Sequence, residues 1–436
     1  MKIGFYKWSE TDEATKTRIL HRAQADIADV TDKVRPIIED VRLRGDEALL
    51  EYAKKFDRAE LSALKVGEEE IAGAAKTVDP ALKTALDRCI GNVRKFHEEQ
   101  MRRVEEPWMV EIEPGVWAGE RVTPISSVGL YVPGGKNLYP STLYMLAVPA
   151  VVARVPKVIM LTPPRPDGSV PDILLYAAHA SGITEIYKAG GAQAIAAMAY
   201  GTQSIPKVHK VLGPCSPFGA AAKQILSGTV NPGMPAGPSD SLILCDGSAD
   251  PDNTVWDVLN EAEHGPDSAG LLVTHDETLA LYVHKKLAET IAGLPEPQRG
   301  YLEANMAAYS GVILTRTLEE SIEFTNLYAA EHVVLKVRDV EGVLPEIVNA
   351  GEILIGENSP SSLGNYGIGV NHVLPTGGMA HSYSCTSVWD FLKRTSLARV
   401  TAEGLNALKP AVAAMADYEG FPAHGDVLRR RRIYND

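Results

Sequence analysis

The 436-residue sequence contains only four cysteines, and none of them lies in a C-x-x-C pair. Scattered cysteines in so long a chain exclude a disulfide framework and a zinc–thiolate site, and they indicate reduced thiols. The net charge is −13 and no basic tract precedes the C-terminal tail, which argues against nucleic acid or anionic lipid as a partner. The N-terminus lacks an apolar signal core, and the longest apolar stretch, 143–155, is broken by Pro149 and too short to span a bilayer. We therefore expect a cytoplasmic protein with no nucleic-acid or membrane partner.

No internal repeat, P-loop, G-x-G-x-x-G, G-x-S-x-G, HExxH or EF-hand loop occurs. Helical patterns before residue 104 and a β-rich stretch over 108–122 are followed by short apolar runs that alternate with helix-like segments. The strand-like runs begin at Val128, Lys157, Glu185, Val208, Leu242, Gly270, Gly311, Val333 and Glu352. Apolar strands that alternate with helices are typical of parallel sheets covered on both faces. The sequence therefore predicts an α/β protein with two such layers, a boundary near Pro238 and a helical tail from about Ser387.

Three glycine-rich turns follow predicted strands, at 133–135, 190–193 and 213–216. In open α/β sheets, ligands bind beyond the carboxyl ends of the strands, where glycine lets the backbone approach the ligand. One such loop alone is more often a tight turn. Because three such loops follow successive predicted strands, two interpretations stay open: the loops are plain turns, or they form a nucleotide site.

Glu261 and His264 stand three residues apart in a run that is predicted to be helical. Residues with this spacing share one helical face, so a carboxylate and an imidazole can converge on one point. Both groups are good ligands for a divalent metal such as zinc. The same spacing also occurs in a solvated acidic helix with one histidine, and a metal site would need further ligands from elsewhere.

Three other clusters offer chemistry. Glu331 and His332 precede a predicted strand and are suited to general acid–base catalysis if they share a cleft. The glycine-rich, polar segment 365–378 has the composition of a loop at a functional site. Near the C-terminus, Glu419 and His424 provide another carboxylate and imidazole.

Taken together, these residues resemble the histidinol dehydrogenase family along nearly the whole chain. The resemblance is carried by residues 40–49, 55–57, 128–135, 190–197, 236–239, 262–264, 331–332, 371–378 and 390–394. It implies an enzyme that needs zinc and oxidises a primary alcohol to the aldehyde and then the hydrated aldehyde to the carboxylate, with two NAD molecules as acceptors. It also implies two Rossmann-like parallel-sheet domains with helical N-terminal and C-terminal extensions. The expected parts are an N-terminal extension over 1–25, a first α/β domain over 26–127 and 239–386 with the metal and catalytic residues, an NAD-binding second domain over 128–238, and a tail over 387–436.

Matched motif by motif, the resemblance implies that His332 is the base and that Glu331 activates the water of the second step. The residues at the NAD positions are Tyr131, Gln193 and Ser216. The residues at the substrate positions are Ser239, Glu261, His264, His372 and Glu419. The residues at the metal positions are Glu261, His264, Asn365 and His424. The resemblance further implies an intertwined homodimer in which Glu419 and His424 serve the neighbouring subunit.

The metal positions depart from the family pattern of glutamine, histidine, aspartate and histidine. Here Glu261 stands at the glutamine position and Asn365 at the aspartate position. One carboxylate, one amide and two imidazoles remain, and a metal site responds first to ligand number and total charge. We interpret the two changes as a relocated carboxylate. In the alternative, Asn365 is a poor ligand and the metal keeps an open position.

Two further departures concern the cofactor and the substrate. The sequence has Gly213-Pro-Cys-Ser where histidine-pathway enzymes have Gly-Pro-Gly-Asn, and Ser216 reaches less far than asparagine. Residues 237–240, Gly-Pro-Ser-Asp, are more similar to paralogues that oxidise 2,3-dihydroxypropane-1-sulfonate than to the usual Gly-Pro-Ser-Glu. Histidinol is the first candidate substrate, and another small alcohol such as this sulfonate is the alternative. A metal-binding homologue without activity is a third hypothesis, against which the retained Glu331, His332 and His372 argue.

Overall fold

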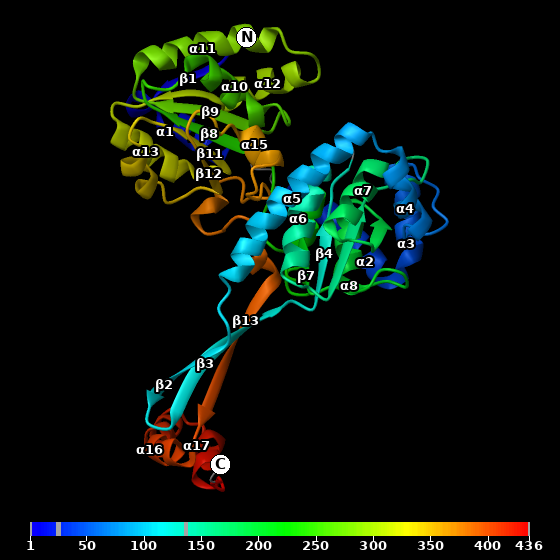
Figure 1. Ribbon diagram of the computed structural model, residues 1–436, viewed down its shortest axis with the longest axis vertical. Helices are drawn as coiled ribbons and strands as arrows, with labels where there is room; N and C mark the ends of the chain where they lie inside the picture. Colours follow the sequence, from blue (N-terminus) through cyan, green and yellow to red (C-terminus); the bar gives the residue numbers. More distant parts are fainter. Residues whose placement is uncertain (1, 23–27, 135–137, 435–436) are drawn as a thin grey trace.

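The chain forms a six-stranded parallel sheet, a four-stranded parallel sheet and a three-stranded antiparallel arm (Figure 1). The computed structural model describes residues 2–22, 28–134 and 138–434. Gly135, at the end of the first predicted glycine turn, lies outside the described residues. Among the residues described, no helix has the length and apolar character that crossing a membrane requires.

The six-stranded sheet has the order β1-β10-β9-β8-β11-β12. Its strands are β1 (Gly4–Lys7), β8 (Asp240–Cys245), β9 (Ala269–Thr274), β10 (Gly311–Leu314), β11 (His332–Lys336) and β12 (Glu352–Ile355). The helices around it are α1 (Glu13–His21), α10 (Pro251–Ala262), α11 (Glu277–Ala292), α12 (Gln298–Ala308), α13 (Leu318–Tyr328) and α14 (Val340–Val343). The apolar side chains of its strands enter two separate buried clusters, since helices cover both faces.

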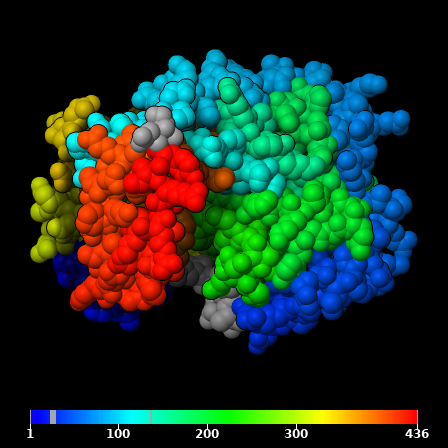
Figure 2. All heavy atoms as spheres, turned by 90° about the horizontal axis from the view of Figure 1, so that it is seen from below, coloured from blue at the N-terminus to red at the C-terminus, as the bar shows by residue number. Residues whose placement is uncertain are grey.

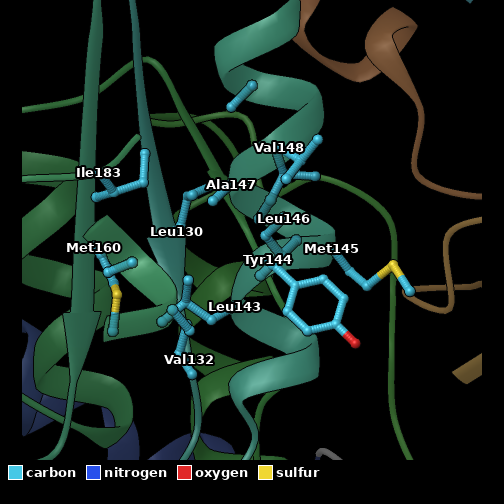
Figure 3. Packing of buried hydrophobic residues seen from close by; sticks show 14 of the residues in the cluster. Leu130, Val132, Leu143, Tyr144, Met145, Leu146, Ala147, Val148, Met160 and Ile183 are labelled. Atoms are coloured by element: carbon cyan, nitrogen blue, oxygen red, sulfur yellow. The ribbon is translucent and has the colours of Figure 1, made fainter. Parts of the chain in front are cut away.

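The four-stranded sheet has the order β6-β5-β4-β7. Its strands are β4 (Ser127–Tyr131), β5 (Lys157–Thr162), β6 (Ile186–Lys188) and β7 (Lys210–Leu212), and its own helices are α6 (Pro140–Val152), α7 (Asp172–Ser181), α8 (Gly191–Tyr200) and α9 (Pro217–Ile225). Helix α6 is apolar around most of its circumference, as expected of a helix that is enclosed by this sheet, by α7 and by α5 (Pro80–Arg102). Figure 3 shows Leu143 and Leu146 of α6 in this core together with Leu130 of β4.

Helices α2 (Ala28–Arg44), α3 (Asp46–Tyr52), α4 (Glu68–Thr77) and α5 (Pro80–Arg102) pack on the four-stranded unit. Helix α2 contacts α8 and α9, α4 contacts α7, and α5 contacts α6. The domain division expected from the sequence joined residues 26–127 with 239–386, which contribute most strands of the six-stranded sheet. In the structure, α2–α5 instead pack on the four-stranded unit. An amphipathic pattern shows which side of a helix is buried, but it does not show which sheet covers that side. The segment 1–25, expected as an extension, contributes β1, which pairs in parallel with β10.

The antiparallel arm consists of β2 (Trp108–Glu113), β3 (Val116–Pro124) and β13 (Leu392–Val400), followed by α16 (Ala402–Tyr418) and α17 (Pro422–Arg429). The tail expected to be helical from Ser387 therefore begins with a short 3-10 turn and a nine-residue strand. Figure 1 shows the arm projecting away from both sheets with the C-terminus at its far end, and Figure 2 views the molecule from that end. Large apolar side chains are exposed on the arm, at Trp108, Met109, Val110, Ile112, Val400, Val412, Met415, Tyr418, Phe421 and Val427.

Candidate active site

A cavity of about 380 Å³ lies between the two parallel sheets. Ser216, which follows β7 and precedes α9, lines it from the four-stranded unit. Ser239 and Asp240, at the start of β8, line it from the six-stranded unit. The carboxyl ends of one sheet therefore approach the amino ends of the other across this cavity.

His332 and Glu331 lie where β11 begins, directly before the apolar run that forms its buried interior. In the register of the sheet, His332 stands opposite Glu352, the first residue of β12, and its Nδ1 lies 2.6 Å from a Glu352 carboxylate oxygen. Its Nε2 lies 3.7 Å from Glu331 and 3.8 Å from Glu261. Burial disfavours the charged imidazolium, but the carboxylates of Glu261, Glu331 and Glu352 outweigh burial and raise the pKa of His332 to about 10.

Glu331 is itself a perturbed acid. Burial raises its pKa to about 8, with a smaller contribution in the same direction from the carboxylates of Asp240 and Glu261. Its pair with His332 is therefore a buried acid–base couple of the kind that clusters at catalytic sites.

Glu261 occupies the last turn of α10, whose start is fixed by the Asp250 carboxylate accepting from the backbone of Asn253. The Glu261 side chain is 1% exposed, and its carboxylate accepts from Nδ2 of Asn365 at 2.6 Å and lies 3.1 Å from Nδ1 of His264. Burial opposes ionisation of Glu261, but His332, His264 and Asn365 together hold its pKa well below the usual range.

Glu261, His264 and Asn365 fit part of a zinc site, because the imidazole and the amide each lie within hydrogen-bond distance of the Glu261 carboxylate. The Asn365 amide presents its nitrogen to Glu261, and a flip of this group would present its oxygen instead. In the part of the chain that the structure describes, no three His, Cys, Asp or Glu side chains are grouped for a metal ion. A fourth ligand would thus have to come from outside this cluster.

His372 lies beside the cluster in the loop after α15 (Ser361–Tyr366). Its Nδ1 lies 2.5 Å from the carbonyl oxygen of Asn365, and its Nε2 lies 3.5 Å from the hydroxyl of Thr142. Burial lowers the pKa of His372 to about 4, which keeps its ring neutral at pH 7. A neutral imidazole can hydrogen-bond a polar substrate without adding charge.

The three residues expected to contact NAD all lie at carboxyl ends of the four-stranded sheet. Tyr131 ends β4, and its hydroxyl accepts from the backbone N–H of Gly191 at 3.0 Å. Gln193 is buried in the first turn of α8, and Ser216 is the N-cap residue of α9. Burial raises the pKa of Tyr131 to about 12, so the phenol remains protonated and can donate. This is the edge of an open sheet at which nucleotides bind.

Glu419 and His424 do not join the cluster within one chain. They lie at the end of α16 and in α17, at the far end of the arm (Figure 1). Their proposed roles remain predictions, and they require a second chain.

Sequence reasoning missed Glu352 and Asp240, the acidic neighbours of the Glu331–His332 pair. Each begins a strand that sequence patterns predict, but strand order and register decide which residues lie beside Glu331 and His332. An acidic residue at the start of an otherwise apolar strand is the signal that could have found both.

The smaller parallel sheet has the order of the first four strands of a dinucleotide-binding fold, and with the buried imidazole–carboxylate cluster it fits the class of α/β dehydrogenases. Within that class the chain belongs to the histidinol dehydrogenase family, since the family model of that description matches residues 20–432.

Individual relatives agree with this assignment. A histidinol dehydrogenase of Synechocystis sp. is 47% identical over 95% of both chains. A histidinol dehydrogenase homolog of Colwellia psychrerythraea is 43% identical over 99% of this chain and 97% of its own length. The crystal structure of histidinol dehydrogenase from Elizabethkingia anophelis matches with a TM-score of 0.90 at 34% identity, covering 96% of each chain.

Proposed function

We propose that the protein is a zinc-dependent, NAD-linked dehydrogenase that oxidises a small polar primary alcohol through the aldehyde to the carboxylate, with histidinol as the first candidate. The observation that supports this most is the buried group of His332, Glu331 and Glu352 at the strand ends. Asp240, which lines the cavity, is hydrogen-bonded to Glu331 of this group. Membership in the family makes histidinol the first substrate to test.

His332 is the proposed base for the alcohol proton. Its Nδ1 contact with Glu352 orients the ring and leaves Nε2 directed toward Glu331 and Glu261. In the second step Glu331 is proposed to take the proton of a water that adds to the aldehyde carbon. Because burial raises the pKa of Glu331, its carboxylate is, once ionised, a stronger base than an exposed glutamate.

When bound, NAD supplies the hydride acceptor of each step and zinc supplies a Lewis acid that holds the substrate and stabilises charge. The proposed metal ligands are Glu261, His264 and Asn365, with His424 of the partner subunit as the fourth. Glu261 would be paired with the dication when it is bound, which would offset the carboxylates that raise the pKa of His332 and favour the neutral imidazole that a base requires. Tyr131, Gln193 and Ser216 are proposed to hold NAD.

Ser239, His372 and the partner subunit's Glu419 are proposed to contact the substrate together with Glu261 and His264. Residues 237–240 favour a second candidate of the same chemistry, 2,3-dihydroxypropane-1-sulfonate. NADH formation by the zinc-loaded protein, measured as kcat/KM for both alcohols, separates the two. A higher value for the sulfonate would replace histidinol, and no turnover of any alcohol by protein with bound zinc would favour a homologue without activity.

Replacing Glu352 by glutamine is expected to lower kcat by at least about 10-fold, because residues that orient a catalytic imidazole typically contribute this much. The amide cannot stabilise the imidazolium that forms when His332 takes a proton. Initial rates of NADH formation at saturating alcohol provide the measurement. Glu346→Gln, a change at an exposed site before the same strand, is the control and should leave kcat unchanged.

A further inference from the structure

A buried ion pair connects the N-terminal segment to the first residue of β8. Arg22, directly after α1, places Nη1 2.7 Å from a carboxylate oxygen of Asp240, and the two side chains are 4% and 2% exposed. The guanidinium carbon lies 3.5 Å from the centre of the Tyr328 ring, and Nη2 donates to the Tyr328 carbonyl oxygen. Arg22 is therefore held on several sides and fixes the carboxylate of Asp240 in turn.

Asp240 binds Glu331 twice. Its backbone N–H donates to Oε2 of Glu331 at 3.1 Å, and its Oδ1 accepts from the backbone N–H of Glu331 at 2.9 Å. Its other oxygen, Oδ2, also accepts from the backbone of Gly377, in a loop that lines the interdomain cavity. One aspartate thus determines both where the Glu331 backbone lies and how its carboxylate is turned.

The two oxygens of Glu331 consequently face different partners. Oε2 is occupied by the Asp240 amide, while Oε1 is directed toward Nε2 of His332 at 3.7 Å. Water activation needs one carboxylate oxygen that is free and fixed in direction. The contacts of Asp240 provide that arrangement.

We propose that Asp240, held by Arg22, is a positioning residue for Glu331 in the water-adding step. This assignment rests on the proposed function. In that step an O–H bond of water breaks and its proton moves to Oε1 of Glu331, while the water oxygen forms a bond to the aldehyde carbon. The π pair of the C=O bond moves to the carbonyl oxygen, which takes up a proton to complete the hydrate. The hydrated aldehyde is then oxidised to the carboxylate as its hydride reduces NAD. The alcohol-oxidising step does not use Glu331 as its base, so Asp240 acts on the second step selectively.

The test feeds the best alcohol to zinc-loaded protein in the presence of semicarbazide, which traps released aldehyde, and measures NADH, aldehyde adduct and carboxylate. The wild type is expected to form about two NADH per alcohol, and Asp240→Asn close to one, with a second step slowed about 10- to 100-fold. Asp240→Glu, which keeps the charge, is expected to regain most of the carboxylate product. In a Glu331→Gln background, Asp240→Asn should change the second step less than about 2-fold, because residues that act as one unit are not additive.

Lys336→Met is the matched control for a purely structural effect. Lys336 lies at the opposite end of β11, where its buried ammonium pairs with Asp257, so the change should lower the melting temperature and leave NADH per alcohol unchanged. If Asp240→Asn slows both steps equally, or adds a further loss in the Glu331→Gln background, the assignment is wrong. If the wild type reduces NAD with none of the alcohols, the proposed function itself fails, and this assignment fails with it.

Discussion

Replacing Glu261 by glutamine is expected to lower the affinity for zinc by more than about 100-fold, because the site loses its only carboxylate. Glu261 is fully buried and contacts both Asn365 and His264, so the change removes the negative charge from the centre of the proposed ligand group. Competition with a zinc-binding dye gives the dissociation constant directly. Glu263→Gln, an exposed change on the same helix end, is the control and should leave the affinity near that of the wild type.

The double change Glu261→Gln with Asn365→Asp is expected to restore zinc binding, since it moves the carboxylate from position 261 to position 365 of the same proposed ligand group. Asn365→Asp alone would set two carboxylates about 2.6 Å apart in a partly buried place. Like charges this close repel strongly, so this variant should melt at a lower temperature without zinc and gain more stability from zinc than the wild type does. Failure of the double variant to recover zinc would refute the relocated-carboxylate hypothesis.

A heterodimer of one His332→Asn chain and one His424→Ala chain is expected to have about half of the wild-type activity, whereas each homodimer is inactive. If the tail of each chain completes the partner's site, one of the two sites in the heterodimer has both histidines intact. The arm projects away from the Glu261 cluster and exposes a group of apolar side chains, including Met415 and Tyr418, as surfaces that bind another chain do.

The heterodimer can be isolated after coexpression by a different affinity tag on each chain. Two tagged copies of the His332→Asn chain serve as the control and should be inactive. An inactive heterodimer would mean that His424 serves its own chain, since each site would then carry one of the two defects. A monomer in solution would remove the basis of the shared site altogether.

The sequence predicted every strand of the two sheets except β1, because each of the others is a short apolar run enclosed by helices. Val128 begins the run that forms most of β4. Gly270 is the second residue of β9, and Gly311 is the first residue of β10. It did not predict the pairing of β1 with β10 or the packing of α2–α5 on the smaller sheet. Both depend on contacts between segments far apart in the chain, which periodicity does not record.

The candidate site likewise has one part that the sequence predicts and another that only the tertiary fold brings together. The Glu331–His332 pair and the Glu261–His264 pair are local in sequence, so spacing alone brings their members together. Glu352 meets His332 only through the register of β11 and β12. Arg22 and Asp240, 218 positions apart, meet only through the packing of α1 near the start of β8. These contacts orient the reactive groups, and they come from the tertiary fold.

In the proposed function, one buried group oxidises a primary alcohol through the aldehyde to the acid with NAD as acceptor. The most direct test is the stoichiometry of a complete reaction by zinc-loaded protein with histidinol, with NADH measured by absorbance and the product by NMR. About two NADH per alcohol and a carboxylate product are expected, because Glu331 is proposed to activate water after His332 has taken the alcohol proton. One NADH per alcohol with the aldehyde as the end product, or no NADH from protein with zinc bound, would contradict it.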